Sequence, residues 1–303
     1  MLGIGGGGDV VGALATARLF QSFGAEFVLG GVSWERWPID PHPGPRPLAE
    51  VRGGRPLSAS AVLADERTTT SDGTQFGEAR MAGFLCSDTV LVDISGGAEA
   101  TAEGLAEAAR KLDCDLIALV DVGGDALAHG DEEGLASPLC DAVMLAAGLR
   151  LAAQLPVIGA VYAPGGDGEL SPREVMERIS ALGRCGALLG SWGLTQAVCE
   201  QIEAAAHVVP TEASVMGVRC ARGETGEAPI RGGLRSVELT PAGGATYYFD
   251  LEAARMGGEI PLAAAVADAA GLSEARDALA ERGIRTELDL EEARARGEEP
   301  LAR

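Results

Sequence analysis

Short apolar segments alternate with helical segments along the first two-thirds of the chain, and this alternation constrains the fold more than any other feature. Strands are predicted at residues 1–4, 26–30, 89–94, 115–121 and 156–162. Helices are predicted at residues 9–23, 98–112, 137–154 and 171–182. Such alternation is typical of βαβ units, and strands that are apolar throughout are covered on both faces. The sequence therefore predicts an α/β fold, with a Rossmann-like, doubly wound, mostly parallel sheet and helices on both faces.

The pattern changes after residue 184. Helices are predicted at residues 195–206, 211–218, 262–270 and 273–282, and strands at residues 236–239 and 246–250. No repeat and no clear linker separates this part from the rest. We therefore expect a single α/β domain over residues 1–303, with residues 1–184 as the parallel core and about 185–290 as a C-terminal extension. The charged tail is expected to fray at its end.

The composition limits the partners and the compartment. The formal net charge is −21, and an acidic surface repels nucleic acid and anionic membranes. The single lysine, Lys111, lies outside any Gly-Lys-Ser/Thr sequence, so a P-loop is excluded. None of the six cysteines forms a Cys-x-x-Cys pair, and no apolar run reaches the roughly 18 residues that span a bilayer. We expect a reduced, cytoplasmic protein, with homo-oligomers as an open alternative.

Glycine pairs with an aspartate close by follow four of the predicted strands. These corners lie at residues 5–9, 93–97, 121–125 and 163–167. The carboxyl ends of parallel strands share one edge of a sheet, where ligands bind in such folds. Glycine amides approach a ligand closely, and amides at a helix start bind anions, although each pair also suits an ordinary turn. The predicted ligand-binding residues at these corners are Gly5, Gly6, Gly7, Gly8, Asp9, Ser95, Gly96, Gly97, Gly123 and Gly124.

Aspartates at the same corners are the candidate metal ligands. Asp93, Asp121 and Asp125 are predicted to hold Mg²⁺, which prefers oxygen ligands, and Asp121 and Asp125 are also candidate catalytic residues. His129 is the third catalytic candidate, as a general base. Asp141 joins the cluster from a first helical turn, where an acid also complements the helix dipole. The alternatives are an Asx turn for Asp121 and an exposed loop position for His129.

Two loops are expected to close over this edge of the sheet. Trp34 and Arg36 lie in an irregular stretch at residues 33–60, and a loop of that length is usually functional or disordered. The indole offers a flat apolar face, and Arg36, like Arg46, offers a forked cation for phosphate or carboxylate. Thr70 belongs to a run of hydroxyl residues that suits oxyanion binding, although such runs are also ordinary in loops.

Clustered arginines occur near the C-terminal strands, as Arg219, Arg222, Arg231 and Arg235. In so acidic a protein we expect them to pair with surface acids, with anion binding as the alternative.

The first glycine loop formally matches Gly-x-Gly-x-x-Gly, the dinucleotide-binding pattern. Gly3, however, lies inside the first predicted strand, and the second predicted strand ends in glycine without an acid to hold a ribose. An NAD(P)-dependent oxidoreductase is therefore only the third hypothesis.

Several motifs together resemble a known family. They are GGGGDVV, SWERWPIDPHPGPRP, DVGGDALAHGDEEGLASPLCDA, PTEAS and IRGGLRSVEL. They are similar to the prokaryotic proteins grouped as domain of unknown function 1152, over about residues 1–290. The resemblance implies a cytosolic α/β protein and no particular reaction. The loop at residues 121–130 is also similar to the glycine-aspartate loops with which phosphofructokinase-type kinases hold phosphate and Mg²⁺.

The leading hypothesis is an enzyme that acts on a phosphorylated or nucleotide-like small molecule by metal-assisted phosphoryl or glycosyl transfer. Its expected ligand is an anionic small molecule, with Mg²⁺ as candidate cofactor and neither nucleic acid nor membrane as a partner. The second hypothesis is a nucleotide-binding sensor or interaction protein without catalysis, because the same edge could hold a nucleotide without converting it.

Overall fold

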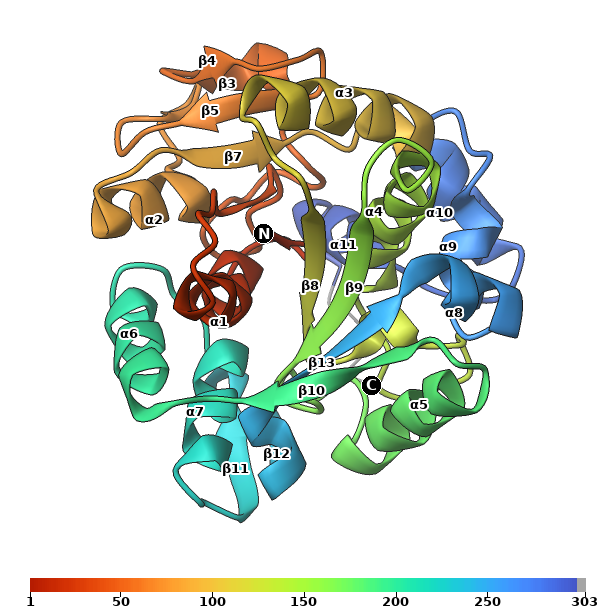
Figure 1. Cartoon of the computed structure of the whole chain (residues 1–303). Coiled ribbons are helices and arrows are strands. Elements are labelled where there is room, and N and C mark those ends of the chain that lie inside the picture. Colours follow the sequence, from red (N-terminus) through yellow and green to blue (C-terminus); the bar gives the residue numbers. More distant parts are fainter. Residues whose placement is uncertain (299–303) are drawn as a thin grey trace.

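The strands of the predicted alternation form the parallel centre of one large sheet. The computed structural model describes residues 1–298 (Figure 1). Five strands are parallel: β1 (Leu2–Gly3), β2 (Gly30–Val32), β7 (Thr89–Val92), β8 (Ile117–Val122) and β9 (Val157–Tyr162). Antiparallel strands extend both edges: β4 (Arg55–Pro56), β5 (Ala61–Ala64), β10 (Leu188–Gly193) and β13 (Ala245–Asp250). The order is β10-β13-β9-β8-β1-β2-β7-β5-β4, and the predicted Rossmann-like α/β fold is confirmed.

Two short antiparallel ladders lie outside the large sheet. One pairs β3 (Val51–Arg52) with β6 (Thr69–Thr70), and the other pairs β11 (Gly226–Ile230) with β12 (Arg235–Leu239). The second ladder is a hairpin whose tip is the short helix η3 (Arg231–Gly233). The other short 3₁₀ helices are η1 (Leu48–Glu50), η2 (Asp125–Leu127) and η4 (Pro241–Gly244).

Helices cover both faces of the sheet (Figure 1). One face carries α1 (Asp9–Ser22), α2 (Gly77–Leu85), α6 (Gln196–Ala206) and α7 (Ala213–Ala221). The other carries α3 (Gly97–Lys111), α4 (Pro138–Leu151), α5 (Pro172–Arg184), α8 (Leu251–Gly257), α9 (Pro261–Val266), α10 (Leu272–Ala280) and α11 (Glu287–Ala295). No helix within residues 1–298 is both long enough and apolar enough to cross a membrane.

β1 and β8 form the switch point of the sheet. From β1 the chain passes through α1 to β2 on one face, whereas α3 returns it across the other face to β8. The loops that leave the carboxyl ends of β1 and β8 therefore diverge, and a crevice remains between them. Because α1 follows β1 and α4 follows β8, both helices begin at this edge. The C-terminal part adds β10 and β13 to the same sheet, beside β9.

The second strand lies later in the chain than the sequence predicts. The apolar run suggests residues 26–30, whereas β2 spans Gly30–Val32. β2 packs too closely against neighbouring elements to accommodate side chains at its glycines, since a Cβ on Gly30 would lie 2.4 Å from the Val90 carbonyl oxygen. A Cβ on Gly31 would lie 2.1 Å from Glu78 Oε1. The glycine pair therefore forms this strand instead of ending it.

Several elements have no counterpart in the sequence prediction, namely β5, α2, β10, β11, α8 and α11. All six residues of β10 are exposed, so the strand lacks the buried apolar run that identifies the others. α11 is charged over most of its length, and its apolar contact to the core is supplied mainly by Leu288. Residues 299–303, where fraying is expected, lie outside the described residues.

The contact of α1 with the sheet depends on Gly12. A Cβ at this position would lie 2.4 Å from Val122 Cγ2 and 2.9 Å from Tyr162 Cδ1. We predict that Gly12→Ala lowers the free energy of unfolding by about 1–3 kcal/mol, because overpacking displaces side chains or backbone. Urea denaturation measures this change.

A second helical glycine is the matched control. A Cβ on Gly183, in α5, would meet only Leu188 Cδ2, at 3.9 Å. Gly183→Ala should therefore raise the free energy of unfolding by up to about 1 kcal/mol, from helix propensity alone. Equal effects of the two substitutions would contradict the tight packing at Gly12.

Candidate functional site

A cavity of about 490 Å³ lies at the carboxyl ends of β1, β8 and β9. Its walls come from the loops after these strands, from the first turn of α4 and from the segment that leads into α7. The polar lining includes residues 5–9, Arg36, Asp125, Asp141, Asp167 and Glu169. Three of the four predicted glycine-aspartate corners therefore border one cavity.

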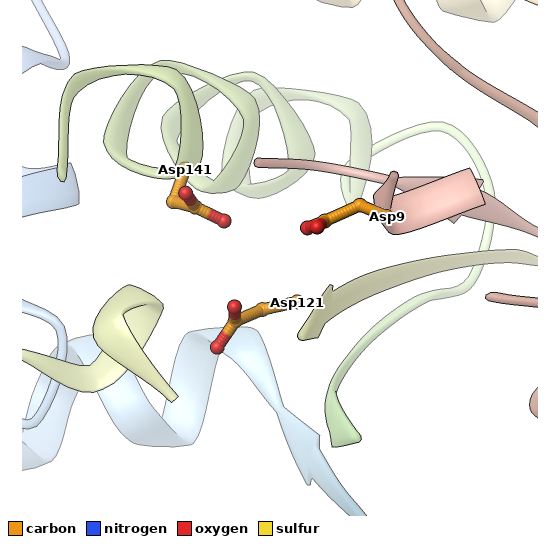
Figure 2. Close-up of side chains that lie close together, drawn as sticks. All are labelled: Asp9, Asp121 and Asp141. Atoms are coloured by element: carbon orange, nitrogen blue, oxygen red, sulfur yellow. The ribbon is translucent and has the colours of Figure 1, made fainter. Parts of the chain in front are cut away.

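Three carboxylates from different elements converge beside this cavity. Asp9 begins α1, Asp121 lies in β8 and Asp141 lies in the first turn of α4. Figure 2 shows the three side chains pointing toward one another, and one oxygen of each lies within 4.8 Å of the others. A cation with oxygen ligands at 2.0–2.6 Å places opposite ligands about 4–5 Å apart. The group is therefore compact enough to share one ion.

The two inner carboxylates of this group have no hydrogen-bond donor. Asp121 and Asp141 are each 1% exposed, and within residues 1–298 none of their carboxylate oxygens has a hydrogen-bond partner. Asp9 differs, because its Oδ2 accepts a hydrogen bond from the Gly5 amide at 2.9 Å. Buried polar atoms in folded proteins are nearly always paired. Two unpaired buried carboxylates facing one another therefore require protons or a cation.

Burial and mutual repulsion raise the pKa values of these groups. Burial raises the pKa of Asp9 to about 7, although the Gly5 amide and Arg36 act in the opposite direction. Burial, followed by the charge of Asp9, raises the pKa of Asp121 well above its usual range. Burial, followed by the charge of Asp121, has the same effect on the pKa of Asp141. The group therefore holds protons at neutral pH unless a cation replaces them.

A second group of carboxylates, Asp125, Asp167 and Glu169, lies on the same cavity with oxygens within 4.8 Å of one another. Burial, followed by the charge of Glu169, raises the pKa of Asp167 to about 8. Glu169 is well supplied with donors, since it accepts hydrogen bonds from the amides of Ala136 and Ser137 at 2.7 and 2.8 Å. The protein itself therefore offsets part of the negative charge of the second group, which it does not do for Asp121 and Asp141.

The opening glycine loop lines the cavity and contains amides without a hydrogen-bond partner within residues 1–298. The Gly7 amide donates to the Trp34 carbonyl at 2.9 Å, whereas the amides of Gly6 and Gly8 have no partner within residues 1–298. Gly6 has φ +77° and its Cβ would lie 2.8 Å from the Trp34 carbonyl, so only glycine fits. Free amides at the start of α1 suit an anion.

Gly123 and Gly124 serve the packing of the site. Both have left-handed φ values, and neither lines the cavity. A Cβ on Gly123 would lie 2.3 Å from Asp167 Cγ, and one on Gly124 2.7 Å from Val175 Cγ1. These glycines therefore allow Asp167 and α5 to approach the end of β8.

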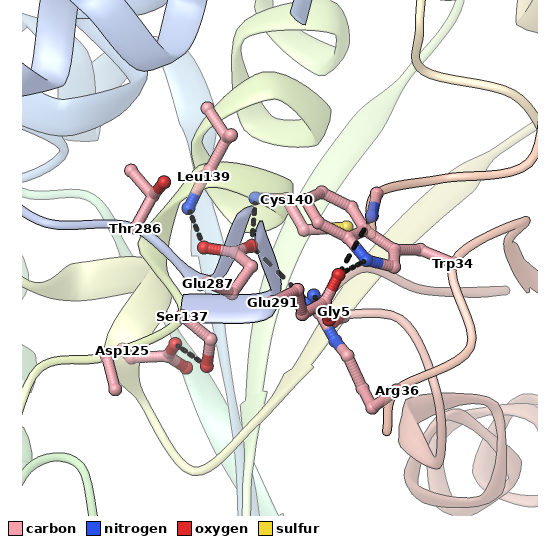
Figure 3. A network of polar contacts seen from close by, with 12 residues as sticks. Gly5, Trp34, Arg36, Asp125, Ser137, Leu139, Cys140, Thr286, Glu287 and Glu291 are labelled. Carbon is pink, nitrogen blue, oxygen red and sulfur yellow. Dashed lines mark hydrogen bonds and ion pairs between the residues drawn. The ribbon is translucent and has the colours of Figure 1, made fainter. Parts of the chain in front are cut away.

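Arg36 lines the cavity, whereas Trp34 does not. Figure 3 shows the two side chains close to Gly5. The guanidinium of Arg36 lies 4.3 Å from the centre of the Trp34 ring and donates to the Gly5 carbonyl. Trp34 is fully buried, and its Nε1 donates to Glu291 Oε2 at 2.9 Å. Trp34 therefore supports Arg36 and does not form the cavity wall.

Two acids of α11 complete this network (Figure 3). Glu287 and Glu291 lie 3.4 and 3.5 Å from Arg36. Glu287 also accepts hydrogen bonds from the amides of Leu139 and Cys140, at 3.0 and 2.9 Å. The N-terminus of α4 is thus occupied by a carboxylate from another helix.

The corner after β7 lies apart from the cavity. Asp93 accepts hydrogen bonds from the amides of Leu48 and Ser95 at 2.9 and 2.8 Å and joins neither carboxylate group. A Cβ on Gly97 would lie 2.6 Å from the Ala269 carbonyl, so this corner packs on C-terminal helices. The physical reason is the strand order, because β2 separates β7 from β1. The structure therefore does not bring Asp93, Ser95, Gly96 or Gly97 to the other candidates.

Thr70 and His129 are also placed elsewhere. The hydroxyl of Thr70 donates to Asp72 and accepts from the Thr74 amide at 2.8 Å, so it closes its own turn. His129 lines a separate opening with Arg178 and Glu259, and burial lowers its pKa. Neither residue borders the cavity that contains Asp125 and Asp141.

Two acids of the site, Glu169 and Glu287, were missed by sequence reasoning. Glu169 follows the fourth corner by two residues, in the loop after β9, and could have been included from that position. Glu287 begins α11, and nothing in the charged tail distinguishes it from a surface acid. Arg46 is engaged in a buried ion pair with Asp40 at 2.6 Å and is not available to a ligand.

Comparison with known proteins gives one match. A family described as protein of unknown function (DUF1152) matches residues 1–295 of the chain. No curated protein and no solved structure matches the sequence significantly.

The carboxylate groups predict an unusual pH dependence of stability. Raised pKa values, about 7 for Asp9 and about 8 for Asp167, mean that the folded state binds more protons than the unfolded state above about pH 4. The free energy of unfolding of the metal-free protein should therefore decrease as the pH rises toward 8. Calorimetry in a chelator between pH 6 and 8 should record a Tm that decreases by several degrees.

Asp9→Asn tests the origin of this decrease. The substitution removes one carboxyl group whose pKa is raised, and it should therefore make the Tm less dependent on pH. A Tm of the wild-type protein that is constant or increases over this range would contradict the repulsion among the carboxylates.

Proposed function

The chain belongs to the family of proteins of unknown function DUF1152, as its motifs predict, and because that membership names no reaction, we propose a function from the site. The protein is a divalent-cation-dependent enzyme that acts on a phosphorylated or nucleotide-like small molecule. The observation that carries this proposal is the buried group Asp9, Asp121 and Asp141, whose two inner members lack any donor within residues 1–298.

A cation accounts for this group better than protons alone. Asp141 lies in α4, which is buried and otherwise apolar around the position, so an unpaired acid there costs stability. A divalent ion of the Mg²⁺ type binds carboxylate oxygens and keeps positions for water or phosphate. The fold brings the three carboxylates from β1–α1, β8 and α4, which are the elements at the switch point.

A phosphate is the ligand that fits beside such a cation. The free amides of Gly6 and Gly8 and the start of α1 favour an anion. The carboxylates of Asp9 and Asp141 on the same cavity would repel that anion unless a cation lay between them. A phosphate with a bound cation would therefore pair with the free amides and also offset the repulsion from the carboxylates.

Metal-assisted phosphoryl transfer is the reaction class that these groups support best. Within residues 1–298 the cavity lining contains no histidine, lysine or cysteine, so a carboxylate must handle the proton. Asp125, whose pKa is raised by burial and then by Asp141, is the candidate base for the acceptor hydroxyl. In such a transfer the acceptor hydroxyl would give its proton to Asp125 and bond to phosphorus as the leaving oxygen departs with its electron pair. Asp9, Asp121 and Asp141 would hold a cation that offsets the negative charge of the phosphate.

The dinucleotide hypothesis has less support. The Asp9 carboxylate lies at the first position of α1, where the pyrophosphate of a dinucleotide is held in that fold class. This repulsion applies equally to any other phosphate, so the hypothesis loses support mainly because β2 ends without an acid to hold a ribose.

Asp121→Asn tests the metal site directly. In chelator the variant should have a Tm equal to or above that of the wild type, because one of three repelling carboxylates is removed. Added Mg²⁺ or Mn²⁺ should raise the Tm of the wild type and leave that of the variant unchanged. Differential scanning fluorimetry with and without the cation measures both effects.

Asp93→Asn is the matched control, since it alters a strand-end aspartate outside the cavity. It should lower the Tm in chelator, because Asp93 holds two amides, and retain the response to the cation. A cation response in Asp121→Asn equal to that of the wild type would overturn the site.

Turnover distinguishes the enzyme from a sensor. Phosphate release from a panel of nucleotides and sugar phosphates, with acceptors present, should depend on the cation and be lost in Asp121→Asn. A nucleotide that stabilises the protein but is recovered unchanged would favour the sensor.

A further inference from the structure

A second cavity of about 460 Å³ adjoins the first. The two have six lining residues in common: Arg36, Trp37, Pro38, Ser137, Glu169 and Arg231. The second cavity continues outward between α11 and the β11–β12 hairpin, and it lacks the aspartates of the first. A ligand could therefore extend from the carboxylates into a space of different chemistry.

Large apolar side chains stand exposed on this second cavity. Trp37 is 56% exposed and Leu234 is 87% exposed, although both line a concavity. Leu290 of α11 contributes a third apolar wall. Exposed apolar surface inside a cavity is typical of a ligand-binding site, because the ligand covers it.

Cationic groups surround this apolar surface. The guanidinium of Arg294 lies over the Trp37 ring, 4.9 Å from its centre. Arg36 and Arg231 line the junction of the two cavities. Arg36 and Arg231 pair with Glu287, Glu291 and Glu169 of the same lining, so within residues 1–298 Arg294 is the arginine that remains to attract the negative charge of a ligand.

The hairpin tip is built to present its side chains to the cavity. Gly232 and Gly233 adopt left-handed φ values of +67° and +87°, and a Cβ on either would meet no atom within 4 Å. They form a tight, open turn between Arg231 and Leu234, and the Arg231 amide donates to Glu212. The turn therefore holds an arginine and a leucine at the rim without packing them into the core.

We propose that Trp37 and Leu234 bind the flat aromatic ring of a nucleotide whose phosphates lie at the carboxylates. This inference rests on the proposed function and specifies its substrate class. A planar ring matches the indole face of Trp37, and Leu234 supplies a second apolar contact. A purely aliphatic chain would cover Leu234 and Leu290 but would neither stack on the Trp37 ring nor engage Arg294.

Isothermal titration calorimetry compares two probes that share their anion and differ in the ring. ADP and pyrophosphate are each titrated into the full chain with excess Mg²⁺. We expect ADP to bind on the order of ten- to a hundredfold more tightly, which is the usual contribution of stacking. Trp37→Ala should remove most of this difference and leave the affinity for pyrophosphate unchanged.

Further variants separate stacking from loss of structure. Trp37→Phe should restore part of the preference for ADP, and Leu234→Ser should reduce it, because an 87% exposed side chain can be replaced without unfolding. Trp192→Ala is the control, since Trp192 is 50% exposed on β10 and lines neither cavity.

The outcomes distinguish the two proposals. Equal affinities of the wild type for ADP and pyrophosphate, or an unchanged preference in Trp37→Ala, would overturn the ring site while the cation site stands. Failure of both probes to bind, together with no effect of Mg²⁺ on Tm, would overturn the proposed function and the ring site with it.

Discussion

Repulsion among buried carboxylates at the ends of β1, β8 and β9 is the constraint on which the rest of the site depends. Six acids take part: Asp9, Asp121, Asp125, Asp141, Asp167 and Glu169. The arginines on the same cavity, Arg36 and Arg231, are both already paired with glutamates. Without a cation the carboxylates therefore hold protons at neutral pH, and in the proposed function a cation would replace these protons and help to bind an anion.

The surrounding structure separates acids that support the site from acids that are free to act. Glu169 and Glu287 use their oxygens on amides at the start of α4, and both are held in place by that helix. Asp121 and Asp141 receive no such donors within residues 1–298. Because supplying a donor takes only a nearby amide or hydroxyl, its absence at two adjacent carboxylates is the observation on which the proposed cation site rests.

The sequence predicted the part of the site at the strand ends better than the part formed by the long loop and α11. Alternating apolar runs predict β1, β8 and β9 as strands of one parallel sheet, and their glycine-aspartate corners then share one edge. Asp93 shows the limit of that inference, since a shared edge does not reveal that β2 separates β7 from β1. Trp34 was expected to cover a ligand, but it is buried and bonded to α11. The charged sequence of the tail did not predict that helix. Glu287 was missed for the same reason, because only tertiary contact gives it a role.

Chemistry and recognition come from different parts of the chain. The parallel core supplies the carboxylates and the glycine loop, whose geometry is fixed by strands packed on both faces. The outer cavity is bordered by Trp37 from a long loop, by the tip of the β11–β12 hairpin and by α11. Loops and hairpin tips accept substitution more easily than buried strands. In the proposed function, substrate preference can change through Leu234 and Arg294 without altering the carboxylates, because neither side chain lines the cavity that contains Asp9 and Asp141.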